Sequence, residues 1–150
     1  WGHTGLHRLR KMYGKRMYGE GHLIGNHTYR HVDLSKISGR EAEKEIKTTD
    51  EAIKKITGHE TEFIRPPFGA MPEGEEDPDK IYVKWTVDSL DWVTKDTEKI
   101  VEKVTADTKE GDVILMHDCY GESVEAALQI VDIMEKQGYE FVTADELIIN

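Results

Sequence analysis

Apolar residues recur at three- or four-residue spacing in several stretches of the chain, which is the pattern of amphipathic helices. The first such stretch covers Leu6–Tyr18 and ends at Gly19. The second opens with Ser38 and Glu41 at the spacing of a capping box, in which a serine side chain and a glutamate side chain satisfy the first free amides of a helix. Gly58 closes this second helix, because glycine favours the left-handed conformation that ends many helices.

Two further helices are predicted in the second half of the chain. One covers Thr97–Asp107 and the other ends just before Gly138, and a last helical turn or two covers Ala144–Ile148. The apolar residues that the spacing turns toward the core are Ala42, Ile46, Ala52, Ile53 and Ile56 in the second helix, Ile100, Val101 and Val104 in the third, and Val124, Ala127, Leu128, Val131 and Met134 in the fourth.

Short apolar runs between these helices predict β-strands. The expected strands are Leu23–Ile24, Phe63–Ile64, Ile81–Val87, Val113–Met116 and Glu140–Thr143. Because strands alternate with helices along the chain, we expect an α/β fold with a mainly parallel sheet.

Composition narrows the kind of protein. The 150 residues have the length of one domain, and 37% are hydrophobic, which together with the regular periodicity indicates a folded globule. The net charge of −10 disfavours nucleic acid or an anionic membrane surface as partner and suits a neutral or cationic substrate. The single cysteine, Cys119, excludes an internal disulfide and a cysteine-based zinc site. No apolar run approaches the length of a membrane span.

Polar residues with useful chemistry follow the predicted strands. His27 and His31 come after the first, Arg65 after the second, and further clusters at Asp91 and His117 after the later ones. In parallel α/β folds such strand ends are where reactive groups gather. On one helical turn, two histidines four residues apart share a face and could bind a single metal ion. A pair of solvent-facing histidines is the alternative, and it stays open on this spacing alone.

Four motifs then occur in a fixed order, H-x3-H, R-P-P-F-G, D-S-L-D-W and L-M-H-D. In this order they resemble the polysaccharide deacetylase family (carbohydrate esterase family 4, the NodB-homology domain), and the resemblance covers nearly all of the chain. It implies a distorted (β/α) barrel that lacks its first one or two strands in this sequence. Residues 1–150 would then be an N-terminally incomplete catalytic domain.

The resemblance also implies roles for individual residues. His27 and His31 match the two histidines that bind a divalent metal, usually zinc and sometimes cobalt, nickel or manganese. His117 matches the general acid that protonates the departing amine, and Asp91 the carboxylate that orients it. Arg65 matches the arginine that pairs with the catalytic base. Without the other motifs, the His–Asp pair could be an ordinary hydrogen bond, and the arginine a surface ion pair.

The same resemblance indicates how substrate would be held. Pro67 and the preceding proline fix the backbone so that the amide N–H of Phe68, which replaces a common tyrosine, helps to hold the oxyanion. Trp92 and Leu115 correspond to the apolar wall that receives the acetyl methyl group and the sugar face, although Trp92 could equally be a core residue. The expected activity is metal-dependent hydrolysis of N-acetyl groups on an acetylated glycan such as chitin oligomers or peptidoglycan, with O-acetyl esters as the runner-up. Such substrates suggest an extracellular or cell-envelope location.

One departure from the family leaves two interpretations open. The family's first motif, of the T-F-D-D-G-P type, supplies the catalytic base and the third metal ligand, and no Asp-Asp pair occurs in these residues. Either this motif precedes Trp1 in the complete protein, or the chain is a catalytically dead pseudoenzyme that binds a glycan or a metal. We favour the first interpretation.

Overall fold

The computed structural model describes residues 4–72 and 77–149, and the side chains of residues 12–72 and 77–148. These residues form two compact units, Trp1–Lys84 and Trp85–Asn150, and each is described here by itself. The assignment of the whole chain to one domain stays a prediction. None of the described helices is both long and apolar enough to cross a membrane.

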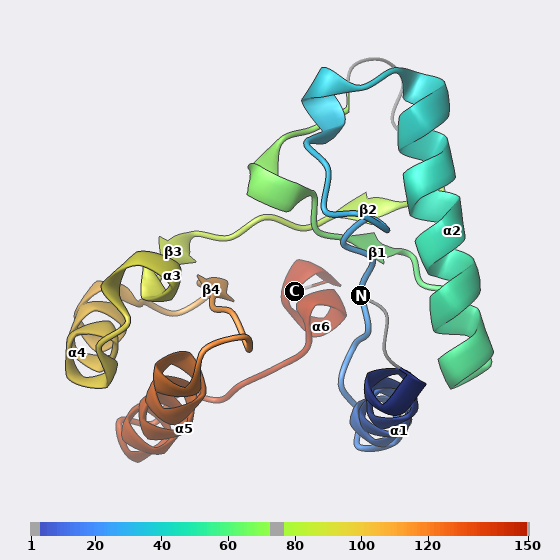
Figure 1. The fold of residues 1–150 in the computed structure, drawn as a ribbon. Helices are drawn as coiled ribbons and strands as arrows, with labels where there is room; N and C mark the ends of the chain where they lie inside the picture. Colours follow the sequence, from blue (N-terminus) through green and yellow to red (C-terminus); the bar gives the residue numbers. More distant parts are fainter. Residues whose placement is uncertain (1–3, 73–76, 150) are drawn as a thin grey trace. The chain divides into compact units, whose positions relative to one another are not determined.

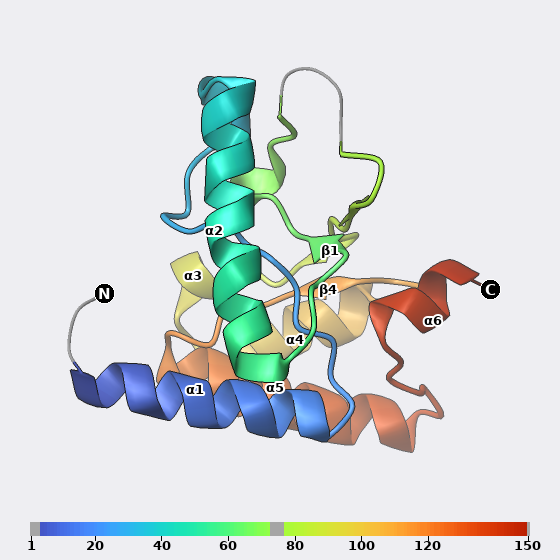
Figure 2. The same cartoon turned by 90° about the vertical axis from the view of Figure 1, so that its right-hand side faces the viewer.

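The first unit consists of helices and a small parallel sheet (Figures 1 and 2). Its elements are α1 (Thr4–Gly19), the 3-10 turn η1 (Leu34–Lys36), α2 (Gly39–Thr57), β1 (Phe63–Ile64), the 3-10 turn η2 (Pro67–Gly69) and β2 (Ile81–Tyr82). Strand β1 pairs with β2 in parallel, with Phe63 opposite Ile81. The first two predicted helices and the strand Phe63–Ile64 are confirmed.

The ends of α2 follow from local sequence. The Ser38 side chain accepts a hydrogen bond from the Glu41 amide and the Glu41 side chain bonds back to the Ser38 amide, so the capping box is present. Gly58 ends the helix in the left-handed conformation, with φ of 87°. On the core face Ile46 is buried, but the prediction for Ala52 was wrong, because this residue is exposed. Six residues at about 100° each turn Ala52 well away from the side of Ile46.

Two strand predictions near β1 and β2 need correction. Leu23–Ile24 forms no strand. Instead, Asn26 makes a single parallel bridge to Ile64, through hydrogen bonds between the Asn26 amide and the Phe63 carbonyl and between the Arg65 amide and the Asn26 carbonyl. The predicted strand Ile81–Val87 is in fact two short strands, because its two ends pair with different partners.

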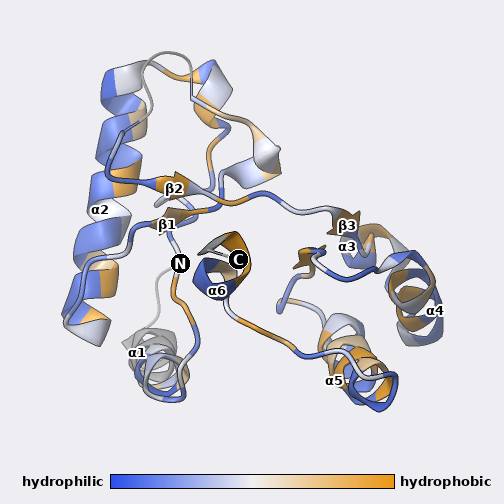
Figure 3. Cartoon of the chain, turned by 180° about the vertical axis from the view of Figure 1, so that it is seen from behind, coloured by the Kyte–Doolittle hydropathy of each residue, from blue (hydrophilic) through white to orange (hydrophobic). Residues whose placement is uncertain are grey.

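The second unit contains β3 (Val87–Asp88), α3 (Asp91–Thr94), α4 (Thr97–Asp107), β4 (Ile114–Leu115), α5 (Gly121–Lys136) and α6 (Ala144–Ile149). Strand β3 pairs with β4 in parallel, with Val87 opposite Ile114, so the expected parallel pairing is confirmed in both units. In Figure 3 the strands and parts of α4 and α5 are coloured as hydrophobic. Residues 140–143 form no strand, and Phe141 and Val142 are about half exposed.

The core of the second unit lies between α4 and α5. It consists of Ile100, Val104, Ala126, Ile130 and Met134, with Val101, Ile114, Met116 and Tyr139 packed against it. The prediction for α4 is confirmed in its bounds and its buried face. For α5 the existence of the helix and the burial of Met134 are confirmed, but the predictions for Val124, Leu128 and Val131 were wrong, because these residues are exposed. The helix carries two apolar series, and the one that contains Ala126, Ile130 and Met134 packs against α4.

Candidate functional site

The histidine pair lies in a loop, not on a helical turn as the spacing suggested. Thr28 and His31 have φ of 61° and 56°, in the left-handed region that residues other than glycine adopt at a cost of about 1–2 kcal/mol. This path still brings the two rings together, with the centroids of His27 and His31 4.8 Å apart and nearly perpendicular. The two imidazoles are therefore adjacent, as predicted, but a loop and not a helical turn brings them together.

Asn26 holds the beginning of this loop. Its side chain is buried, and its Oδ1 accepts a hydrogen bond from the Thr28 amide at 2.8 Å while its Nδ2 donates to the Ile46 carbonyl of α2 at 2.8 Å. The Thr28 hydroxyl in turn accepts a hydrogen bond from the Val32 amide. These contacts offset the unfavourable conformation of Thr28.

Glu45 of α2 holds the middle of the same loop. Its buried carboxylate accepts one hydrogen bond from the Arg30 amide at 2.8 Å and another from the Arg30 Nε at 2.7 Å. Burial acts to raise the pKa of Glu45, but the hydrogen bonds from Arg30 outweigh it, so the pKa lies below its ordinary value. Sequence analysis missed this residue, although a glutamate between Ala42 and Ile46 on a buried helix face was a usable signal.

One nitrogen of His27 is already engaged. Its Nδ1 lies 2.5 Å from the carbonyl oxygen of Arg65, and because a carbonyl only accepts, Nδ1 must carry the proton. In the neutral ring the lone pair is then on Nε2. A histidine that donates from one nitrogen to a backbone carbonyl and ligates through the other is common at metal sites.

The segment after β1 brings Arg65 and Phe68 beside this loop. Pro66 and Pro67 are buried, and Phe68 has φ of 60° and an exposed side chain. The ring of Phe68 meets that of His31 edge-on, with centroids 5.1 Å apart. The first unit thus gathers both histidines, Arg65 and Phe68 around one loop.

The Arg65 guanidinium contains a buried donor atom. Its Nε is buried and has no hydrogen-bond partner within residues 12–72 and 77–148. Burial lowers the pKa of Arg65. A buried cationic donor of this kind is stabilised by an anionic partner.

Asp91 and His117 are joined in the second unit. The fully buried Asp91 carboxylate accepts hydrogen bonds from the His117 ring Nδ1 at 2.8 Å and from the His117 amide at 2.7 Å. The Trp92 amide adds a third at 2.9 Å. Burial acts to raise the pKa of Asp91, but its hydrogen bonds with His117 outweigh this effect, so the pKa lies below its ordinary value. This pairing engages Nδ1 of the ring. Any proton that the ring gives or takes therefore moves through its second nitrogen, Nε2.

Two residues expected to contact substrate also lie in this unit. Trp92 is 51% exposed, so the alternative that it is a core residue is wrong. Leu115 is half-buried in β4, two positions before His117. An exposed indole near a histidine–aspartate pair suits contact with a sugar face.

The residues present fit a divalent metal as two of its ligands. Neutral imidazole nitrogens are suitable ligands for zinc, cobalt and nickel. Among the residues that the structure describes, no group of three or more His, Cys, Asp or Glu side chains could hold a metal ion. Within the described residues, His27 and His31 could therefore provide at most two of the ligands of a metal ion.

Comparison with known proteins extends this description. The sequence profile described as "Polysaccharide deacetylase" matches residues 9–82. The chain is 37% identical over 133 residues to the peptidoglycan-N-acetylmuramic acid deacetylase PdaC of Bacillus subtilis, an alignment that covers 88% of this chain and 28% of PdaC. It is 35% identical to a peptidoglycan-N-acetylglucosamine deacetylase of Bacillus cereus, covering 86% of this chain and 50% of that protein.

Solved structures show the same relationship. The structure of PdaC superposes with a TM-score of 0.89 at 33% identity, over 93% of this chain and 70% of that chain. A pseudoenzyme of carbohydrate esterase family 4 from Bacillus anthracis, 21% identical, shares the fold with a TM-score of 0.80, over 93% of this chain and 51% of that chain. The predicted fold class is confirmed. The chain spans between about a quarter and a half of the length of the two curated relatives.

Proposed function

Because the chain belongs to the polysaccharide deacetylase family, we propose that it is an enzyme that hydrolyses N-acetyl groups on a cell-wall glycan. The names of the two relatives specify N-acetylmuramic acid and N-acetylglucosamine of peptidoglycan as their targets. An N-acetyl amino sugar of peptidoglycan is therefore the substrate that we favour, and the cell envelope is the location that it implies. O-acetyl esters are the second choice.

The observation that carries this proposal is the Asp91–His117 pair. Hydrolysis of an amide produces a poor leaving group that must be protonated as the C–N bond breaks. With Nδ1 bound to the Asp91 carboxylate, the His117 ring exchanges its proton with substrate only through Nε2. The ring is partly exposed, at 37% of its side-chain surface, so substrate can reach it. His117 is the proposed general acid, and Asp91 holds its orientation.

Other residues would bind the substrate and the charge that develops on it. The amide N–H of Phe68 would donate a hydrogen bond to the oxyanion, in a segment whose path Pro66 and Pro67 restrict. Trp92 would contact the sugar ring and Leu115 the acetyl methyl group. Arg65, whose buried Nε has no partner among the described residues, would bind a carboxylate, consistent with its match to the arginine that pairs with the base aspartate.

We propose that His27 and His31 hold a divalent metal, with zinc preferred and cobalt, nickel or manganese as alternatives. When bound, such a cation polarises an amide carbonyl and lowers the pKa of a water molecule. The Arg65 carbonyl contributes by fixing the tautomer of His27, so that Nε2 carries the lone pair.

Acetate release tests the proposal. Protein expressed from the complete gene is incubated with peptidoglycan and with chitin oligomers, with and without a chelator, and acetate is measured. We expect release that the chelator abolishes and that added zinc restores. Release that persists in the chelator would overturn the metal dependence. Release from acetylated xylan alone would favour the ester reaction.

The second candidate is a glycan-binding or metal-binding pseudoenzyme. It is favoured by the lack of an Asp-Asp pair in the sequence and of a third clustered ligand among the described residues. Glycan binding by the complete protein without acetate release would support this candidate and overturn the first.

A further inference from the structure

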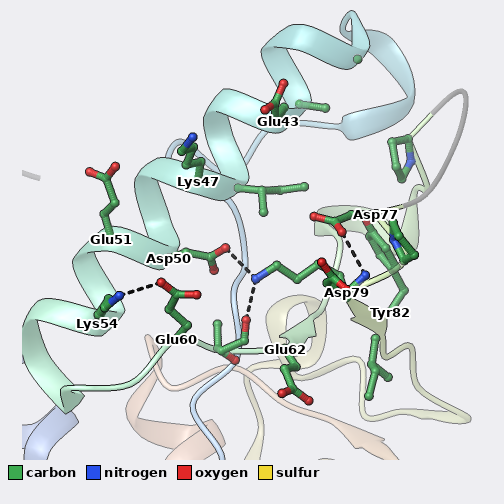
Figure 4. A pocket seen from close by; sticks show the side chains of 18 residues that line it. Glu43, Lys47, Asp50, Glu51, Lys54, Glu60, Glu62, Asp77, Asp79 and Tyr82 are labelled. Atoms are coloured by element: carbon green, nitrogen blue, oxygen red, sulfur yellow. Dashed lines mark hydrogen bonds and ion pairs between the residues drawn. The ribbon is translucent and has the colours of Figure 1, made fainter.

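A largely buried ion pair connects α2 to the residue that precedes β2. Lys80 donates from its Nζ to the Asp50 Oδ2 at 2.7 Å and to the Thr61 carbonyl at 2.6 Å. The side chains of Lys80 and Asp50 are only 13% and 15% exposed. Figure 4 shows Asp50 pointing from α2 into the groove between this helix and the segment that leads into β2. The second ion pair in this view, Lys54 with Glu60, is exposed.

The Asp50 carboxylate also reaches the histidine loop. Its Oδ1 accepts a hydrogen bond at 2.7 Å from Nδ2 of Asn26, the residue that directly precedes His27. Lys80, Asp50 and Asn26 thus form a continuous chain of hydrogen bonds that starts in the groove and ends at the Thr28 amide, between the two histidines.

This chain fixes which way the Asn26 amide points. Its NH₂ group faces two groups that only accept, the Asp50 carboxylate and the Ile46 carbonyl, so its oxygen must face the Thr28 amide. If the amide turned over, its NH₂ would meet the N–H of Thr28 and its oxygen would meet two acceptors. The Asp50 carboxylate is therefore one of two acceptors, beside the Ile46 carbonyl, that support the hydrogen bond holding Thr28 in its left-handed conformation.

We propose that Asp50, held in place by Lys80, is a positioning residue for the His27/His31 pair. The inference rests on the proposed function, because it concerns the residues that would bind the metal. Asp50 acts through Asn26 and Thr28, which stand directly before and after His27 in the chain. This positioning role differs from a general contribution to stability. It predicts that loss of this ion pair weakens metal binding, whereas loss of another ion pair of the same helix does not.

Zinc titration by calorimetry tests this role in four variants of the full chain. Partners of metal ligands typically contribute about 10–100-fold to metal affinity. We expect Asp50→Ala to weaken zinc binding by about 10-fold or more, Lys80→Met to weaken it by a smaller factor, and Lys80→Arg to restore most of it. Lys54→Met is the matched control, because it removes a lysine from an exposed ion pair of the same groove. It should leave zinc affinity within about 2-fold of wild type.

Amide hydrogen exchange of Thr28 in the metal-free protein provides an independent measurement. We expect faster exchange at Thr28 in Asp50→Ala and unchanged exchange in Lys54→Met, because only the former loses one of the two acceptors that orient Asn26. Thermal melts show which variants are folded. If Asp50→Ala does not fold, the comparison of zinc affinity between Lys80→Met and Lys80→Arg decides whether the positioning role holds.

The outcomes separate this proposal from the proposed function. Folded Asp50→Ala with wild-type zinc affinity would overturn the positioning role while leaving the metal site intact. Zinc binding that is absent in wild type, or that is unchanged by His27→Ala, would instead overturn the proposed metal site. In that case unchanged Thr28 exchange in Asp50→Ala would overturn the positioning role as well, and faster exchange would support it.

Discussion

The Asp91 carboxylate binds His117 twice, through the ring Nδ1 and through the backbone amide of the same residue. One carboxylate therefore fixes both the position of the His117 backbone after β4 and the rotation of its ring. Leu90, with φ of 54°, places Asp91 at the first position of α3, where its carboxylate also accepts the Trp92 amide. This double contact gives the histidine one orientation before any substrate binds.

Replacement of His117 by alanine tests its role as general acid. General acid catalysis contributes about 10²–10⁴-fold to rate, so we expect His117→Ala to lower acetate release by a factor in this range. Zinc affinity should stay at the wild-type value, because His117 is not one of the proposed ligands. Acetate release at the wild-type rate from a folded His117→Ala protein would exclude the general-acid role.

The Asp91→Asn variant keeps the His117 ring but weakens the contacts that orient it, so it tests the orienting role of Asp91 by itself. The asparagine has the same shape but only one oxygen, so it cannot accept from both N–H groups of His117. We expect the turnover number to fall by about 10²-fold or more while KM changes little, since the ring is still present but less well oriented. The split between the two parameters is measured by steady-state kinetics on a soluble chitin oligomer. A rise in KM with unchanged turnover would instead assign Asp91 to substrate binding.

The depressed pKa of Asp91 predicts the pH dependence of stability. The folded-state pKa lies below that of the unfolded chain, which is about 4, so the stabilisation by the ionised carboxylate is complete above that pH. It is lost as the pH falls through the folded-state pKa. We expect Asp91→Asn to cost about 1.5–3 kcal/mol at pH 7 and progressively less below about pH 4. Urea unfolding of both proteins at pH 7 and in acid measures this difference, and a gap that stays constant with pH would contradict it.

The placement of Arg65 and His117 could be predicted from sequence because it depends on local patterns. Arg65 directly follows β1 and His117 lies two residues after β4, so each stands just past a short parallel strand of its own unit, where reactive groups of α/β folds commonly lie. The conformation of the histidine loop could not be predicted in this way. The left-handed backbone at Thr28 is held by Asn26, which is itself held by residues of α2 twenty or more positions away. No periodicity of the loop itself records those contacts.

Glu45 offers a test of how α2 supports the loop. In Glu45→Gln one of the two acceptors for Arg30 becomes an NH₂ group, which leaves an N–H of Arg30 without its partner. We expect a loss of about 1–3 kcal/mol in the free energy of unfolding, measured with urea. Glu43→Gln, an exposed position on the same helix, is the control and should change stability by less than about 0.5 kcal/mol. Equal effects of the two substitutions would argue against a specific role for Glu45.

The buried face of α5 was the largest error in the prediction of packing, and it can be tested by substitution. Leu128 and Met134 were both predicted to face the core, but Leu128 is 64% exposed, whereas Met134 is 2% exposed and packs against α4. A helix that is apolar on two sides gives no periodic signal for which side is buried, so only the partner helix decides. We expect Met134→Ala to cost about 2–5 kcal/mol in the free energy of unfolding. Leu128→Ala should stay within about 0.5 kcal/mol of wild type, because its side chain already contacts solvent. Urea unfolding of both variants measures the two costs, and a larger loss for Leu128→Ala would show that Leu128 is buried as the sequence predicted.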